Sequence, residues 1–214
     1  MGSRLIKFVL IFCLIVGISG CTFIFQKGRR SDMEKIEQLS KELDELARVK
    51  MLLENSLQSE IKDKKVKLEM MEKGLVITVV GDVLFDSGKD KIRLEAYPLL
   101  DKVAKVLNED IPDLSVGIEG HTDNQPIKFS GWKSNWELSS HRALSVLHYL
   151  VDNKGVLPGR ISAIGYGEFK SVASNDTEKG KQLNRRVEIV ILPRVSKVKE
   201  TKPADILEPK ENLK

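Results

Sequence analysis

Apolar positions divide the 214 residues into four stretches that differ in periodicity. An apolar run, FVLIFCLIVGI, stands near the N-terminus, and apolar residues then recur at steps of three and four across residues 32–73. From Leu75 onward, short β-branched runs alternate with amphipathic stretches, until charged residues and proline take over after Pro193. The pattern predicts a leader segment, a long helix, one folded domain over residues 74–193 and a disordered tail over residues 194–214.

The folded domain is predicted to alternate strands and helices. The runs LVITVV, LSVGIEG, RISAIGYG and VEIVIL have the β-branched or alternating character of strands. EAYPLLDKVAKVLNED and SNWELSSHRALSVLHYLVDN have apolar residues at helical spacing, and Ser134 with Glu137 forms a capping-box signal at the start of the second. A polar, lysine-rich piece before the last strand has room for a short helix. The order β-α-β-α-β-(α)-β indicates an α+β fold, a two-layer sandwich with the sheet on one side.

Residues 32–73 contain neither glycine nor proline and predict a helical spacer. Its heptad-spaced apolar positions are Ile36, Leu39, Leu43, Leu46, Leu53 and Leu57. The register then fails, because Lys50 and Lys64 occupy a positions while Glu60 and Lys67 occupy d positions. Two interpretations stay open: a short coiled coil that joins copies of the chain or binds another envelope protein, and a solvated monomeric helix. If fully helical, the segment would extend roughly 60 Å at 1.5 Å per residue.

The N-terminus has the three parts of an export signal over residues 1–20: basic Arg4 and Lys7, the apolar run, and small residues before Cys21. The tetrapeptide ISGC resembles a bacterial lipobox, which implies cleavage before Cys21, a lipid on its thiol and a linker over residues 21–31. Thr22 is not the aspartate that resembles an inner-membrane retention signal, so we expect the outer membrane, with the domain facing the periplasm. The alternative is an uncleaved anchor over residues 8–25.

Charge and cysteine content narrow the class of protein. The net charge of +4 would fall to +2 with the signal removed, which is too weak to indicate nucleic-acid binding. The two cysteines leave no disulfide in the mature chain, because Cys13 would depart with the signal and Cys21 would carry lipid.

Three strings then identify a family resemblance. LFDSGKDKI follows the first predicted strand, GHTDN and SNWELSSHRA lie in the middle, and GYGE and NRRVEIVI lie at the end. Their order and spacing resemble the OmpA-like (OmpA/MotB C-terminal) peptidoglycan-binding domain over about residues 75–193. With the lipobox, the architecture is similar to that of a peptidoglycan-associated lipoprotein.

The resemblance implies a pocket for the diaminopimelate of a peptidoglycan stem peptide, whose side-chain end is a zwitterion. Such a group needs a carboxylate for its ammonium and a guanidinium for its carboxylate. Asp123 and Arg142 match the family positions with these roles. Asn135 is expected to cap the helix and close the pocket edge, and Thr122, Leu138 and Phe85 to form walls. By resemblance alone, Asn184 and Arg185 are expected to contact the pocket.

An enzyme is not expected. Three histidines and no free cysteine offer few ligands for a metal, and Ser139 and Ser140 lie within a capped helix without the strained turn of a nucleophile. His121 is therefore predicted to pack beside the loop and help to orient Asp123. We expect no catalytic residue, no metal and no cofactor.

The middle string departs from the lipoprotein pattern, because 19 positions separate Asp123 from Arg142, about four more than that subgroup has. The extra residues include Phe129 and Trp132, and their role stays open; HTDNQPI and SNWELS are more similar to the flagellar stator subgroup. The apolar N-terminal run carries no acid, which a stator's proton path would need. The sequence thus favours a non-enzymatic outer-membrane lipoprotein that tethers the membrane to peptidoglycan. The alternative is a stator-like or accessory subunit that anchors a motility or secretion complex to peptidoglycan.

Overall fold

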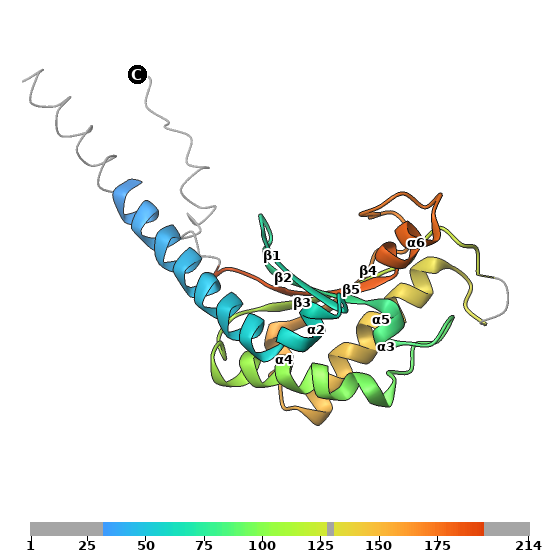
Figure 1. The fold of residues 1–214 in the computed structure, drawn as a ribbon. Helices are drawn as coiled ribbons and strands as arrows, with labels where there is room; N and C mark the ends of the chain where they lie inside the picture. The colour runs from blue at the N-terminus through green and yellow to red at the C-terminus, as the bar shows by residue number, and fades with distance from the viewer. Residues whose placement is uncertain (1–31, 128–130, 195–214) are drawn as a thin grey trace, which may run out of the picture.

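The structure is a computed structural model, and it describes residues 32–127 and 131–194. The expected signal peptide, Cys21 and its linker lie outside the described residues, as do Phe129 and the tail from residue 195. Figure 1 shows a twisted sheet with helices packed along one face and a long N-terminal helix that extends away from one end.

The sheet has five strands in the order β1-β2-β5-β3-β4. Its strands are β1 (Val66–Met71), β2 (Gly74–Val80), β3 (Val116–His121), β4 (Ile161–Gly165) and β5 (Arg186–Ile191). β3 and β4 run parallel, and every other neighbouring pair is antiparallel. The long chain between β3 and β4 carries the crossover helix that a parallel pair requires. The predicted α+β class and the predicted order from β2 to β5 are confirmed.

The described helices within the domain are α2 (Gln58–Lys62), α3 (Gly81–Leu84), α4 (Tyr97–Glu109), α5 (Asn135–His148) and α6 (Glu178–Asn184). Shorter turns lie at Leu94–Ala96, Tyr149–Asn153 and Pro158–Arg160. The apolar faces of α4 and α5 cover one face of the sheet, where Leu100, Ile118 and Val146 are fully buried. This packing forms the core and accounts for the amphipathic spacing of both helices.

A pair of glycines fixes how closely α5 approaches the sheet. Gly120 and Gly165 are directly opposite each other on β3 and β4. A Cβ atom on Gly120 would overlap the Ser139 carbonyl, and one on Gly165 would overlap the Ser140 side chain. Only glycine permits this approach, which sets the start of α5 directly against the carboxyl end of β3.

The N-terminal helix, described over residues 32–56, corrects the expected spacer. Helix α2 ends at Lys62 and strand β1 begins at Val66, so the expected helix to Lys73 is wrong from residue 63 onward. The fold therefore starts before residue 74. The leucine positions of the heptad also divide. Leu46, Leu53 and Leu57 are buried in the domain core, whereas Ile36, Leu39 and Leu43 are each about 60% exposed. The chain's own domain thus buries the apolar side chains in the second half of the seam.

None of the helices within residues 32–127 and 131–194 combines the length and the apolar character needed to cross a bilayer.

Candidate functional site

A pocket of about 990 Å³ opens where β2 and β3 end and α5 begins. Seven of the eight residues predicted for the site lie on its lining: Phe85, Thr122, Asp123, Asn135, Leu138, Arg142 and Arg185. Asp82 and the loop from Asp86 to Lys89 complete the wall opposite α5. The three strings that are widely separated in the sequence therefore meet in one cavity.

Arg142 is a buried cation at the base of this pocket. Its Nε donates to the Lys89 carbonyl at 2.9 Å, and its Nη2 donates to the Asp86 carbonyl at 3.2 Å. Its guanidinium also lies 5.1 Å from the centre of the Phe85 ring. Among the described residues, no carboxylate lies within the 4.0 Å of an ion pair with Arg142. Burial lowers the pKa of Arg142 to about 10, so it stays charged at neutral pH.

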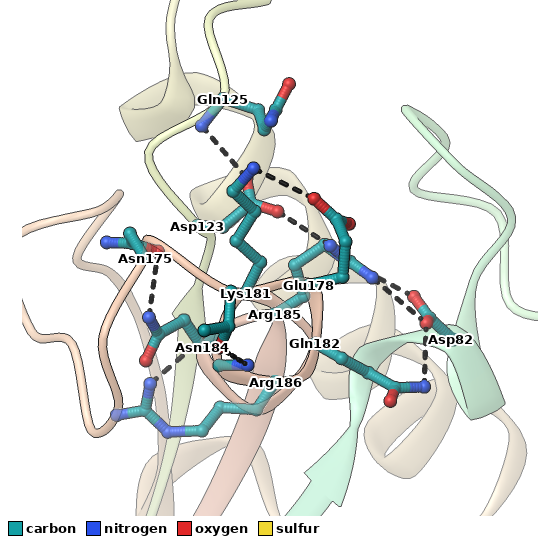
Figure 2. A network of polar contacts seen from close by, with 12 residues as sticks. Asp82, Asp123, Gln125, Asn175, Glu178, Lys181, Gln182, Asn184, Arg185 and Arg186 are labelled. Carbon is teal, nitrogen blue, oxygen red and sulfur yellow. Dashed lines mark hydrogen bonds and ion pairs between the residues drawn. The ribbon is translucent and has the colours of Figure 1, made fainter.

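Asp123 faces the pocket but pairs with a different arginine (Figure 2). Its Oδ2 accepts from Arg185 Nη1 at 2.7 Å, and its Oδ1 accepts from the Gln125 backbone N–H at 3.1 Å. Arg185 also donates to both oxygens of Asp82 at 3.2 and 3.3 Å. Burial lowers the pKa of Arg185, but these hydrogen bonds outweigh burial and raise it overall. Asp123 and Arg142 are thus two separate groups on one cavity, each held by its own partners.

Asn135 does not cap α5, contrary to expectation. Ser134 is the N-cap, and its hydroxyl accepts from the Glu137 backbone N–H at 3.3 Å. The Asn135 amide instead donates to the Gln125 carbonyl at 3.1 Å and to Glu168 Oε2 at 2.7 Å. Asn135 closes the pocket edge, as predicted, by tying the loop after β3 to the loop after β4.

Asn184 does not line the pocket, which corrects the assignment made by resemblance. Its side chain accepts from the backbone N–H groups of Val172 and Ala173 and donates to the Ala173 carbonyl and to Asn175 Oδ1. These four bonds fix the loop before α6, and α6 ends next to Arg185. The role of Asn184 is therefore to hold Arg185's segment in place.

Thr122 and Leu138 form buried walls, as expected. The Thr122 hydroxyl has no hydrogen-bond partner among the described residues. Trp132, from the longer loop, donates its indole N–H to the Gly88 carbonyl at 2.9 Å and packs against His141. One part of the loop whose role was open thus braces the wall that holds Arg142.

His121 lies on the opposite face of the sheet from α5 and not in the pocket. It stacks on Tyr166, and its Nε2 lies 3.9 Å from both Glu119 and Glu188. The possible ligand atoms of these three side chains lie within 4.8 Å of one another, close enough for a cation. However, Lys73 Nζ already lies 2.6 Å from each carboxylate, and Arg186 also pairs with Glu188. The cluster's own lysine and arginine balance its charge, and it fits a buried ion network.

The site defines a class of protein: an α+β domain that presents an acid and a separate buried guanidinium on one polar pocket. The OmpA family profile matches residues 84–185, which include every residue of the pocket lining except Asp82. The chain belongs to the OmpA family through this domain.

Named relatives have the same domain. Motility protein B of Bacillus subtilis is 42% identical over 151 residues, which cover 71% of this chain and 58% of that protein. The cell wall anchor of the T6SS from Pseudomonas aeruginosa is similar in structure, with a TM-score of 0.60 and 36% identity over 66% of this chain and 96% of that one. The periplasmic domain of Helicobacter pylori MotB has a TM-score of 0.58 and 26% identity over 69% of this chain and 93% of that one. The chain spans little more than half the length of the Bacillus protein.

Sequence reasoning missed Asp82 and the carbonyls of Asp86 and Lys89. Asp82 lies two residues past the end of β2, within α3, and its position close to a strand end was an available signal. The carbonyls had none, since any residue supplies one. Their direction depends on the bridge between Phe85 and Ile92 that closes the loop.

Proposed function

We propose that this chain is a non-enzymatic anchor that binds peptidoglycan reversibly through the diaminopimelate end of a stem peptide. The observation that carries the proposal is Arg142, a buried guanidinium that faces the pocket with no carboxylate partner among the described residues. Leaving a buried charge unpaired is costly, so a protein that retains one is suited to receive an anion.

The arrangement matches the zwitterion in both charge and hydrogen-bonding capacity. A guanidinium has five N–H groups. The carbonyls of Asp86 and Lys89 use one each, which leaves N–H groups for a ligand carboxylate. The N-terminus of α5 begins at the same rim and favours negative charge there. Asp123 supplies the acceptor for the ligand's ammonium.

Binding of the ammonium would involve an exchange of partners. Arg185 already holds Asp123 at 2.7 Å, but it is also bonded to Asp82. If the ammonium takes Asp123, Arg185 retains Asp82 and is not left unpaired. The exchange lowers the net gain of binding and supports a reversible contact.

Pull-down with purified sacculi tests this proposal. We expect the unmodified chain to sediment with sacculi, and Asp123→Ala and Arg142→Ala to remain in solution. Matched controls are Asp152→Ala and Arg194→Ala, two exposed positions away from the pocket. If Asp123→Ala and Arg142→Ala bind sacculi as well as the controls do, the site assignment is wrong.

The attachment to the membrane is a second part of the proposal. We propose cleavage before Cys21, a lipid on its thiol, and placement in the outer membrane with the domain in the periplasm. Intact mass of the membrane-extracted protein tests it, because lipidation adds acyl mass to a chain that begins at Cys21. A mass that includes residues 1–20 would favour an uncleaved anchor instead.

The alternative is a stator-like or accessory subunit that anchors a motility or secretion complex to peptidoglycan. Its support is the similarity to Motility protein B and to the T6SS anchor, together with the N-terminal helix. The exposed part of the helix seam, Ile36, Leu39 and Leu43, offers a contact for a second copy or a partner subunit. Crosslinking from Leu39 distinguishes the two roles: a captured membrane-complex subunit supports the alternative, and a chain that stays monomeric supports the simple tether.

A further inference from the structure

An exposed aromatic pair lies beside the pocket, where Trp136 directly follows the lining residue Asn135. The rings of Trp136 and Phe169 stack with centroids 5.1 Å apart and planes inclined by 22°. Trp136 is 49% exposed and Phe169 is 64% exposed. Their stacking leaves outer ring faces in water, where large apolar side chains gain nothing from the fold.

The pair is tied to the pocket by consecutive residues. Asn135 donates to Glu168 at 2.7 Å across the rim, and the next residue of each segment, Trp136 and Phe169, forms the aromatic contact. The polar pair lies at the pocket edge, and the aromatic pair is its immediate neighbour along both segments. A ligand that extends from the pocket past Asn135 therefore comes close to the two rings.

The platform is held rigidly. Gly167, with φ of +56°, lies against Trp136, and its N–H donates to the Ser139 hydroxyl at 2.9 Å. Its carbonyl accepts from the Thr122 N–H at 2.9 Å. Because these bonds join the loop after β4 to β3 and α5, the two rings require little ordering when a ligand binds.

The size of the platform favours a small ring over a protein surface. An aromatic side chain offers about 150–250 Å². With about half of each ring system exposed, the pair presents roughly 200 Å², far below the ~800 Å² per partner of a stable protein interface. A single sugar ring is of this size, and its C–H faces complement the electron-rich face of an aromatic ring.

We propose that the Trp136–Phe169 pair is a sugar-binding platform, which takes one N-acetylhexosamine ring of the glycan strand whose stem peptide occupies the pocket. The inference rests on the proposed function, because the stem peptide is covalently joined to that glycan. A stem of three extended residues reaches about 10 Å, which brings the sugar to the rim once the diaminopimelate end lies in the pocket. The platform therefore adds a glycan contact to the peptide contact.

Two ligands separate this inference from the proposed function: a free diaminopimelate-containing tetrapeptide, and the same tetrapeptide joined to its disaccharide. Calorimetry should give tighter binding of the disaccharide-peptide by about 2- to 10-fold. Trp136→Ala and Phe169→Ala should each reduce this ratio to about one without changing the affinity for the free peptide. Trp136→Phe should keep most of the ratio, and Leu144→Ala, an exposed position on α5, should keep all of it.

Each outcome decides a different claim. Equal affinities for the two ligands in the unmodified chain would overturn the platform, as would a ratio that survives both alanine variants. Either result would indicate that the rings contact a protein or a lipid and not the glycan. Failure of both ligands to bind would overturn the proposed function itself.

Fluorescence gives an independent reading that needs no alanine variant. The chain has two tryptophans, so the difference in emission between the unmodified chain and Trp136→Phe reports Trp136, while Trp132 keeps its bond to Gly88. We expect the Trp136 emission to shift with the disaccharide-peptide and to stay unchanged with the free peptide. An equal shift with both ligands would contradict a glycan contact at this ring.

Discussion

Arg185 Nη1 lies 2.7 Å from Asp123 Oδ2, so the carboxylate predicted to receive a ligand's ammonium is already bound to a cation from the end of α6. Arg185 shares its guanidinium with Asp82. When a ligand's ammonium binds Asp123, Arg185 can give up its ion pair with Asp123 and keep its ion pair with Asp82. Asp123 should consequently contribute more than Asp82 to the affinity for the ligand.

Asp123→Asn should weaken binding of a diaminopimelate peptide by about 10- to 100-fold, because it removes the charged acceptor of the ammonium. Asp82→Asn should weaken it only about threefold, since it leaves Asp123 intact but makes it the sole acid partner of Arg185. Calorimetric titration of both variants measures the ranking. A larger effect at Asp82 than at Asp123 would reverse the assigned roles.

Arg142→Lys should reduce affinity at least about 10-fold although it conserves charge. Lysine offers a point charge and cannot hold two loop carbonyls while presenting a planar fork to a carboxylate. Titration with the same peptide, with thermal unfolding as the check on folding, measures this. An affinity equal to that of the unmodified chain would mean that charge alone suffices.

Stability should fall in mildly acidic solution because of His121. Burial lowers its folded-state pKa to about 3, against an ordinary value of about 6.5. The unfolded chain therefore binds the proton more tightly, and the free energy of unfolding should drop by about 2–3 kcal/mol between pH 6.5 and 4.5. Denaturant unfolding at several pH values measures the slope. His121→Phe should remove it over this window, and an unchanged slope would assign it to other groups.

Lys73 should stabilise the fold because it lies between two acids on neighbouring strands. Glu119 and Glu188 are directly opposite each other on β3 and β5, and like charges so placed repel. Lys73 bridges both acids, and Arg186 adds a second positive charge beside Glu188. Because the Lys73 side chain is partly exposed, we expect Lys73→Met to cost about 2–3 kcal/mol of unfolding free energy. Adding Glu119→Gln should restore part of the loss. A double variant no more stable than Lys73→Met would argue against repulsion as the cause.

Substitutions along the helix seam should separate its two halves. Leu53 is fully buried in the domain core, so Leu53→Ala should lower the free energy of unfolding by about 2–5 kcal/mol. Leu39 is exposed, so Leu39→Ala should leave that quantity within about 0.5 kcal/mol. Equal effects would indicate that another chain covers Leu39, which sedimentation at two concentrations would then reveal.

The sequence predicted the elements with clear periodicity, from β2 to β5 with α4 and α5, and it left room for the short helix α6. It failed at β1 for a physical reason. β1 is an edge strand whose outward Lys67 and Glu69 resemble the charged positions of a helix. The turn before it is made by Lys64 at φ 58°, where the usual glycine signal is missing. Continued helix was therefore the simpler interpretation.

For the site, the sequence could bring Asp123 and Arg142 to one cavity but could not assign their partners. The contact between Arg185 and Asp123 joins residues 62 positions apart, and its geometry depends on where α6 ends. Resemblance also placed Asn184 beside the ligand, although its amide is fully used within its own loop. Such side-chain choices depend on packing that no local pattern records.

The part of the N-terminal helix that packs on the domain determines how a pulling force would reach the fold. A pull along this helix would enter the domain as shear across Leu46, Leu53 and Leu57, and Arg194 would brace it through Glu45. Within the described residues, these buried leucines hold the helix against the domain, so the helix does not pivot freely on it. An anchor built this way would transmit tension along the helix to the domain without bending between them. Under a large enough force, the first step of unfolding would be the separation of these leucines from the domain core.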